Sequence, residues 1–366
     1  MKSDLISNRV VRRFAFRAAF ALPLAVFSGD VVAAPYWRLS GIMLSAMCGD
    51  AAAAPSQAPS GNALGTAGGD AAAAEPNASI QYRALEPGEV VLIAVEGNNR
   101  AIPPSGFFGR KTLSFFRASG GAYLAFAALD LGISTGTRRI DLELTGTDGR
   151  PHYWGAELLI HPKQFPVQEL NVDPNYVNLR KTDAERAEIE ADRLHDIFAR
   201  KYSPQLFKGN FISPIPGALT SRFGERRVFN GVLKAPHSGA DLRAPEGAPV
   251  QACAEGKIAF VGPMFYQGNT VILDHGAGLF SLYAHLSKIL VREGESVSQG
   301  KILGQVGATG RVTGPHLHWG TQLGAARVDP FSIVALDFSR WLPRRPASPS
   351  ATKAAPSPKY PDRSTR

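Results

Sequence analysis

Glycine recurs at short intervals along the second half of this 366-residue chain. These residues stand six to nine positions apart at Gly217, Gly224, Gly231, Gly239, Gly247, Gly256, Gly262 and Gly268. Glycine weakens the interior of a strand and readily takes up the backbone conformations of turns. The spacing is therefore typical of short strands joined by turns, and it predicts a β-rich region from about Phe211 to about Leu336.

A smaller β module is expected ahead of that region. Short apolar segments separated by turn signals are predicted as strands at Val90–Val95, Thr112–Phe116, Ala122–Ala127, Ile140–Leu144 and His152–Ile160. The Asp148–Gly149 pair before the last segment is a strong hairpin signal. This number of short strands predicts a β-sandwich over residues 81–170. Its charged side chains are not paired in a way that would carry out chemistry, so we interpret it as an accessory module.

A charged segment over residues 171–208 is predicted to connect the two β regions through a helix. Thr182 is a candidate helix N-cap, and Glu185 would complete a capping box. The helical sequence continues to Arg200, and its apolar residues form one stripe at Ile189, Leu194, Ile197 and Phe198. We expect this helix to pack on one face only.

The N-terminal residues 1–54 have the features of a secretory leader. Arginines precede the apolar run Ala18–Phe27, which is shorter than the ~20 residues needed to cross a bilayer. A second apolar stretch ends at Cys48, so cleavage after Ala34 and cleavage near Ala54 both stay open, as does lipidation of Cys48. We expect secretion across the inner membrane into a Gram-negative periplasm, with no stable membrane span after cleavage.

Two further segments have a biased composition. Residues 55–80 are rich in Ala, Gly, Ser and Pro and are predicted to be a flexible linker. Residues 339–366 alternate Pro, Ser, Ala and basic side chains and are predicted to be a disordered tail. The formal net charge of +9 also belongs to the two ends of the chain, because residues 55–339 balance to zero. A neutral folded region argues against nucleic acid as a partner.

Histidine is concentrated in the second β region. Five of the eight histidines lie between positions 237 and 318: His237, His275, His285, His316 and His318. In a strand, residues two apart point to the same face, so His316 and His318 would share one surface. Two histidines and one carboxylate with an open position are the ligand set of a catalytic zinc site. The chain has only two cysteines, so no disulfide framework is expected.

Three motifs in this region, in this order, resemble those of the M23 family of zinc peptidases, the LytM or lysostaphin type. They are His237-Ser-Gly-Ala-Asp241, Tyr283-Ala-His285 and His316-Leu-His318. The resemblance covers about residues 209–338 and implies zinc bound by His237, Asp241 and His318. It also implies that His285 and His316 are the catalytic pair and that peptidoglycan peptide stems and cross-links are the substrate.

The resemblance extends to the rest of the chain. The upstream module looks like the immunoglobulin-like domain of some M23 proteins. The expected fold is thus mostly β: an immunoglobulin-like sandwich, a connecting helix and a glycine-rich antiparallel sheet that forms the peptidase domain. Within the M23 pattern, Asn230 is a candidate for closing the site in a latent form. The N-terminal module could bind substrate, occlude the site or recruit an envelope protein partner.

The predicted function is a secreted zinc endopeptidase that cuts peptide cross-links of peptidoglycan. The alternative is a latent or non-hydrolytic LytM-type regulator of other wall hydrolases, and retention of all five motif residues favours the enzyme. His275 lies outside the motifs at the end of a predicted strand, and we expect it to be a structural residue. Cys253 has no companion in sequence and is expected to pack as a small buried side chain.

Overall fold

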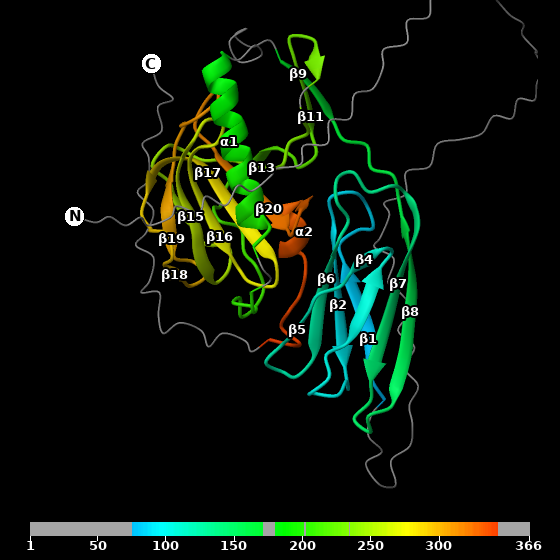
Figure 1. Ribbon diagram of the computed structural model, residues 1–366. Helices are drawn as coiled ribbons and strands as arrows, with labels where there is room; N and C mark the ends of the chain where they lie inside the picture. The colour runs from blue at the N-terminus through cyan, green and yellow to red at the C-terminus, as the bar shows by residue number, and fades with distance from the viewer. Residues whose placement is uncertain (1–74, 171–179, 201–202, 234, 343–366) are drawn as a thin grey trace, which may run out of the picture. The chain divides into compact units, whose positions relative to one another are not determined.

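The computed structural model describes residues 75–170, 180–200, 203–233 and 235–342 (Figure 1). The predicted leader, most of the predicted linker and residues 343–366 of the predicted tail lie outside these described residues. Within the described ranges, no helix is both long enough and apolar enough to pass through a bilayer. The described chain is mostly β, with antiparallel sheets, as predicted.

The N-terminal module is a sandwich of two four-stranded antiparallel sheets. The first sheet has the order β1 (Asn77–Tyr82), β2 (Val90–Glu96), β6 (Tyr123–Ala128), β5 (Phe115–Arg117). The second has the order β4 (Lys111–Thr112), β3 (Ser105–Phe108), β7 (Gly136–Thr145), β8 (Pro151–Ile160). If the eight strands are named A, B, C, C′, D, E, F and G, the sheets read A-B-E-D and C′-C-F-G, the order of an immunoglobulin-type sandwich. The immunoglobulin-like assignment stays a prediction with which this order agrees.

The core of the sandwich follows from alternation along its strands. In β7 the apolar residues Ile140, Leu142 and Leu144 are buried, whereas Asp141 and Glu143 between them are exposed. The predicted Asp148–Gly149 hairpin joins β7 to β8, and Gly149 takes a φ of 82° that suits glycine. The hairpin prediction is therefore confirmed.

Two strand predictions in this module are wrong in detail. The segment Thr112–Phe116 is divided between β4 and β5, which belong to different sheets. Strand β1 begins at Asn77, inside the segment predicted as linker, and it pairs with β2 along its whole length. Its sequence gave little signal because β1 is an edge strand with mostly polar or half-exposed side chains.

Strand β2 is buried on both of its faces. Val91, Ile93 and Val95 belong to the sandwich core. The alternate residues Val90, Leu92 and Ala94 belong to a second core, which they share with side chains of the C-terminal region. A strand that is covered on both sides carries a continuous apolar run instead of an alternating pattern, which explains the sequence of this strand.

The C-terminal region is built on a ten-stranded sheet (Figure 1). Its main path runs β10 (Ala218–Ser221), β13 (Gly239–Arg243), β20 (Leu317–Leu323), β17 (Leu279–Ile289), β16 (Gly268–Asp274), β15 (Gly256–Met264), β18 (Ser296–Val297). The remaining strands pair beside this path: β14 (Pro249–Gln251) with β19 (Ile302–Val306), β19 with β17, and β21 (Ala326–Val328) with β20. These pairs are antiparallel, so the predicted glycine-rich antiparallel sheet is confirmed.

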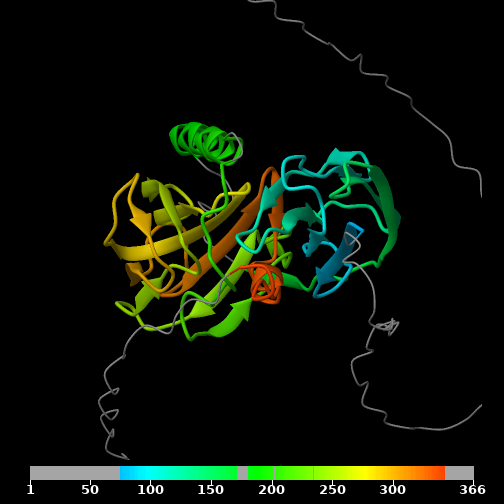
Figure 2. The ribbon, with the colours of Figure 1, turned by 90° about the horizontal axis from the view of Figure 1, so that it is seen from below.

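Helix α1 (Lys181–Phe198) lies along one face of this sheet, as Figure 2 shows. Ile197 is buried and joins Leu194 and Phe198 against Phe260 and neighbouring sheet residues, which confirms packing on one face. Ile189 of the predicted stripe is 69% exposed and does not take part.

The predicted capping box at the start of α1 is wrong. The helix begins before Thr182, with Arg180 at the N-cap position and no side-chain cap. Asp183 in the first turn instead accepts a hydrogen bond from Arg180 Nε at 2.9 Å.

A small three-stranded sheet stands at the junction of the two regions. Strand β9 (Val167–Leu170) leaves the sandwich and pairs in parallel with β11 (Arg226–Phe229), which pairs in turn with β12 (Val232–Leu233). The last residues of the predicted module 81–170 are therefore part of the same sheet as a strand of the C-terminal region. This connection places β11 next to the candidate site.

The C-terminal end of the described chain contacts the sandwich. Val90 N donates to Ser332 Oγ of α2 (Pro330–Val334) at 2.7 Å. Trp341 and Leu342 are buried in the shared core. The ordered structure thus extends beyond residue 339, where the tail was predicted to begin, because these two apolar side chains have a core to enter.

Candidate functional site

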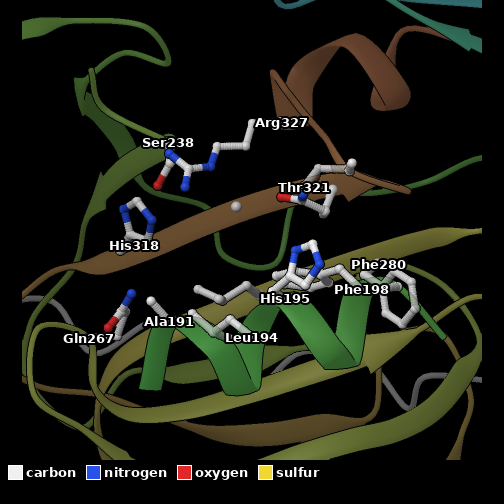
Figure 3. Close-up of a pocket in the computed structure, with 15 residues that line it drawn as sticks. Ala191, Leu194, His195, Phe198, Ser238, Gln267, Phe280, His318, Thr321 and Arg327 are labelled. Carbon is white, nitrogen blue, oxygen red and sulfur yellow. The ribbon is translucent and has the colours of Figure 1, made fainter. Parts of the chain in front are cut away.

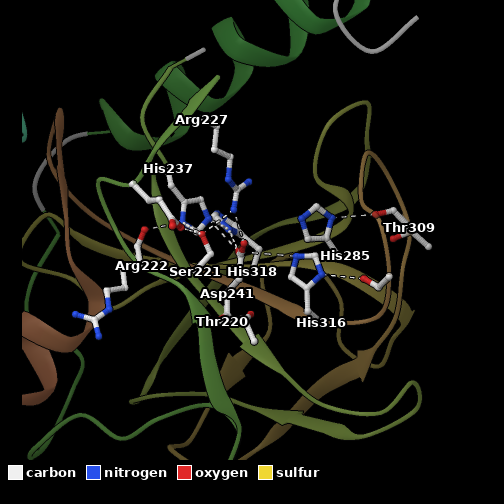
Figure 4. A network of polar contacts seen from close by, with 12 residues as sticks. Thr220, Ser221, Arg222, Arg227, His237, Asp241, His285, Thr309, His316 and His318 are labelled. Carbon is white, nitrogen blue, oxygen red and sulfur yellow. Dashed lines mark hydrogen bonds and ion pairs between the residues drawn. The ribbon is translucent and has the colours of Figure 1, made fainter. Parts of the chain in front are cut away.

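Three of the predicted site residues converge where β13 and β20 of the large sheet pair (Figure 4). Asp241 of β13 and His318 of β20 are direct partners in the register of these two strands, so their side chains share a face. His237 Nε2 lies 2.9 Å from Asp241 Oδ1 and 3.0 Å from His318 Nδ1. His318 Nδ1 lies 2.8 Å from the same Asp241 oxygen. One nitrogen from each ring and one carboxylate oxygen therefore face a common point.

The glycine within the His237–Asp241 motif has a steric reason. A Cβ atom on Gly239 would lie 2.4 Å from the Trp319 carbonyl oxygen and 2.9 Å from His318 Cε1. Real Cβ atoms do not approach backbone that closely, so β13 and β20 can meet here only around a glycine. The motif therefore contains two candidate ligands and the glycine that leaves room for the His318 ring.

His237 stands just ahead of β13 and is held by the preceding segment. Its backbone N–H donates to the Glu225 carbonyl at 2.9 Å, and Nδ1 donates to the Arg222 carbonyl at 2.9 Å. A carbonyl can only accept, so this contact fixes the proton on Nδ1 and leaves the Nε2 lone pair facing the centre. His237, Asp241 and His318 are all buried.

His285 reaches the site through an unusual backbone conformation. In β17, Tyr283 pairs with Trp319 and Ala284 pairs with His318, so regular alternation would direct His285 to the face opposite His318. His285 has a φ of 63°, which breaks this alternation and turns its ring toward the candidate ligands. Its ring centre lies 5.9 Å from that of His318 and 4.8 Å from that of His316.

Two loops hold His285 in this conformation. Its backbone N–H donates to the Gln267 carbonyl at 2.8 Å, and Nδ1 donates to the Thr309 carbonyl at 2.9 Å. His316 is held in a similar way, with Nδ1 donating to the Gly314 carbonyl at 2.9 Å. Its Nε2 lies 3.8 Å from Asp241 Oδ1. Both rings thus point an Nε2 lone pair toward the site.

Burial governs the protonation of these groups. Burial alone would raise the pKa of Asp241, but hydrogen bonds and charge from His237 and His318 hold it well below its usual range. Burial lowers the pKa of His285 to about 3, with the charges of His318 and His316 acting in the same direction. Burial also lowers the pKa of His318. These two rings are therefore neutral at pH 7, the form in which imidazole can accept a proton or bind a metal.

Arg227 is a site residue that sequence reasoning did not single out. It is carried by β11, and its Nη2 donates to Asp241 Oδ2 and to Ser221 Oγ, at 2.8 Å in each case (Figure 4). One oxygen of Asp241 therefore faces the histidines while the other is held by the guanidinium.

A groove of about 830 Å³ opens over the five predicted residues. A smaller pocket of about 270 Å³ adjoins it between α1 and the sheet and shares Ser238, Gln267 and His318 with the groove (Figure 3). His195 and Phe198 of α1 face this pocket. The helix therefore forms a wall close to the site.

The remaining candidates lie elsewhere. His275 is completely buried, donates from Nδ1 to the Glu255 carbonyl at 2.7 Å and contacts Ser281 Oγ through Nε2 at 2.8 Å. Cys253 is buried beside it, and burial raises its thiol pKa to about 11. Both agree with the structural roles predicted for them. Asn230, with a φ of 50°, occupies the turn between β11 and β12 and is not among the residues that line the groove.

Comparisons with known proteins agree with this geometry. The model of peptidase family M23 matches residues 235–330, which include all five predicted site residues. A crystal structure of a putative M23 peptidase from Pseudomonas aeruginosa superposes with a TM-score of 0.53 and 32% identity, covering 69% of this chain and 96% of that one. The chain therefore belongs to peptidase family M23.

Curated relatives match over a part of the chain. Peptidoglycan DD-endopeptidase ShyA of Vibrio cholerae is 43% identical over 102 residues, 28% of this chain and 24% of ShyA. The DD-carboxypeptidase/endopeptidase Mpg of Neisseria meningitidis is 45% identical over 98 residues, 27% of this chain and 23% of Mpg. The match thus spans about a quarter of the length of these relatives.

Proposed function

We propose that this protein is a zinc endopeptidase that hydrolyses peptide cross-links of bacterial peptidoglycan. The observation that carries the proposal is the convergence of His237, Asp241 and His318 on one point, with His285 and His316 beside them in an open groove. Membership of family M23 and the names of the relatives ShyA and Mpg support the same reaction. Because peptidoglycan lies outside the cytoplasm, we also propose that the protein acts there.

The donor set fits zinc. The three candidate ligand atoms lie 2.8 to 3.0 Å from one another. Tetrahedral zinc with ligand bonds of about 2.0 to 2.1 Å places its ligands roughly 3.3 Å apart, so a small outward movement of the side chains is sufficient. Two imidazoles and one carboxylate leave the fourth position open, which is typical of a catalytic site. The side chains proposed to hold zinc are His237, Asp241 and His318.

The other groups of the site would move the protons. A bound zinc supplies activation of water and polarisation of the scissile carbonyl. His316 is the favoured general base: its Nε2 lone pair takes the proton from the attacking water, and the ring later gives that proton to the leaving amine. His285 is the favoured group for stabilising the oxyanion, a role in which its Nε2 has to carry a proton and donate a hydrogen bond to the negatively charged oxygen. Both rings present the same nitrogen to the groove, so an exchange of these two roles is compatible with the geometry.

The test is release of soluble fragments from cross-linked peptidoglycan. Purified protein is incubated with sacculi, with zinc or with a strong chelator, and the products are identified by mass. Loss of cross-linked dimers only in the presence of zinc would support the endopeptidase and identify the bond cut. Absence of hydrolysis by protein shown to hold zinc would contradict it and favour a latent or regulatory protein.

A further inference from the structure

The two oxygens of the Asp241 carboxylate have different partners. Oδ1 lies 2.9 Å from His237 Nε2 and 2.8 Å from His318 Nδ1, whereas Oδ2 accepts a hydrogen bond from Arg227 Nη2 at 2.8 Å. The Asp241 side chain is 8% exposed, and a buried carboxylate oxygen without a donor would cost free energy. Arg227 therefore satisfies the oxygen that does not face the histidines and holds it away from them.

The guanidinium of Arg227 bridges two neighbouring strands beside the candidate metal site (Figure 4). Its Nη2 donates to Ser221 Oγ as well as to Asp241 Oδ2, and Ser221 of β10 is the register partner of Asp241 of β13. The Ser221 hydroxyl in turn donates to the Glu225 carboxylate. A hydroxyl whose proton points to Glu225 can only accept from Arg227, so the direction of each hydrogen bond in this chain is fixed.

The fold sets the position of Arg227 more than the hydrogen bonds of its own side chain do. Its Nε is buried and has no hydrogen-bond partner within the described part of the chain, although an unpaired buried N–H costs free energy. The strand that carries it is held from the other side: Arg227 pairs with Gln168 in the parallel β9–β11 register, and Arg226 N donates to the Pro166 carbonyl at 2.8 Å. The strand that leaves the N-terminal module therefore holds the strand that carries Arg227.

The contact between Arg227 and Asp241 matters for a zinc site. A catalytic zinc has three protein ligands and keeps its fourth position for water or substrate, and a carboxylate can bind a metal through one oxygen or through both. Two oxygens from Asp241 and one nitrogen from each histidine would fill all four positions. Because Arg227 holds Oδ2, only Oδ1 is presented to the metal, and the open position is preserved. Hydrogen bonds to ligand carboxylates are a general feature of metal sites.

We propose that Arg227 is a positioning residue of the metal site: its hydrogen bond to Asp241 Oδ2 orients the carboxylate so that one oxygen binds zinc, and the affinity for zinc depends on that orientation. This inference rests on the zinc site of the proposed endopeptidase. The positive charge of Arg227 also acts on a bound cation, in the opposite direction. The Glu225 carboxylate, which Arg227 reaches through Ser221, offsets that charge, so orientation is the larger effect.

The experiment measures the dissociation constant of the purified protein for zinc by competition with a colorimetric chelator, which needs no hydrolysis. Arg227→Ala removes the donors, and its Kd should be about 10- to 100-fold higher than that of wild type, the usual effect of losing a hydrogen bond to a metal ligand. Arg227→Lys keeps a charged donor without the planar fork and should show a smaller increase. Added guanidinium should lower the Kd of Arg227→Ala again, whereas sodium at the same ionic strength should not.

The control is Arg243→Ala. Arg243 also lines the groove but is exposed, so this variant removes the same charge and should bind zinc as wild type does. An unchanged or lower Kd in Arg227→Ala, or an equal increase in Arg243→Ala, would overturn the inference and leave the proposed function intact. An increase in Arg227→Ala that neither lysine nor guanidinium reduces would also overturn it, since a purely structural residue behaves in that way. Absence of zinc binding by wild type would contradict the proposed zinc enzyme itself.

Discussion

Gly239 and the ring of His318 face each other across the β13–β20 pair, with no room between them for a side chain on Gly239. A Cβ atom at this position would lie 2.9 Å from His318 Cε1 and 2.4 Å from a backbone oxygen. The backbone oxygen cannot rotate away as a flexible side chain would. The position of a candidate metal ligand therefore depends on a residue that has no side chain.

Gly239→Ala should reduce zinc content and lower kcat/KM by about 100-fold, because displacement by about 1 Å is sufficient for a loss of that size. The matched control is Gly320→Ala in the neighbouring strand. A Cβ atom there would meet its nearest neighbours at 3.7 Å, which is ordinary contact. Metal analysis and kinetics on the two variants check the prediction, and equal behaviour would contradict it.

The two groups of histidines should separate by metal content. His318→Ala removes a proposed ligand, so zinc and activity should be lost together. His285→Ala should retain zinc while kcat falls by about 10²- to 10⁴-fold, the usual contribution of acid–base catalysis. The measurement compares the zinc content of the two variants, determined by mass spectrometry, with their kcat values. Full activity of His285→Ala would remove His285 from the mechanism.

An ion pair should stabilise the junction between the sandwich and the peptidase region. Arg83 contacts Glu89, which is 1% exposed, and also Asp329 Oδ2 at 2.6 Å. Arg83→Met leaves the buried Glu89 with Lys163 at 3.4 Å. We expect a loss of about 3 kcal/mol and a Tm lower by roughly 5 to 10 °C.

Thermal unfolding of Arg83→Met should be compared with that of Arg139→Met. The latter breaks the exposed pair of Arg139 with Asp141, and such pairs add little to stability. Similar Tm values for the two variants would show that the junction does not depend on Arg83.

Acid should destabilise the fold through His275. Burial lowers its folded-state pKa from the ordinary value of 6.5 to about 4. Above pH 6.5 the ring is neutral whether the chain is folded or not, so the stability is fully present. As the pH falls from 6.5 towards 4, only the unfolded chain takes up the proton, and stability decreases by up to about 3 kcal/mol.

His285 and His318 add to the same effect, so the measurement is a difference between two proteins. Chemical denaturation of wild type and His275→Gln is followed between pH 7.5 and 4.5. The stability of wild type should fall more steeply with acid than that of the variant, although the variant is less stable at neutral pH. Parallel curves would mean that His275 takes up its proton equally in both states.

Much of the candidate site could be anticipated from local pattern. The strand rule placed His316 and His318 on one face, and the structure pairs His318 with Asp241 across the sheet. His285 is different. Alternation alone predicts that His285 points away from the site, and only the family resemblance predicts that it belongs to the site. The φ of 63° that turns its ring cannot be recognised from the surrounding sequence.

Other features were beyond the sequence because they depend on contacts between distant segments. Arg227 lies on β11 and contacts Asp241. Strand β11 pairs with β9, which lies about 60 residues earlier in the chain. Strand β1 and the buried Trp341 lay in segments with a linker-like or tail-like composition. These two segments are ordered because β1 pairs with β2 and Trp341 packs in the shared core. Local propensity does not reflect such long-range contacts.

The backbone of His285 also bears on attempts to transplant this chemistry into another scaffold. Residues other than glycine rarely adopt its φ of 63°, so histidine itself does not favour the conformation. The Gln267 and Thr309 carbonyls are what compensate for it. A designed sheet that copied the motif letters without these two loops would leave the imidazole on the wrong side. The unit to transplant is therefore the strand that carries His285 together with the two loops that contain Gln267 and Thr309.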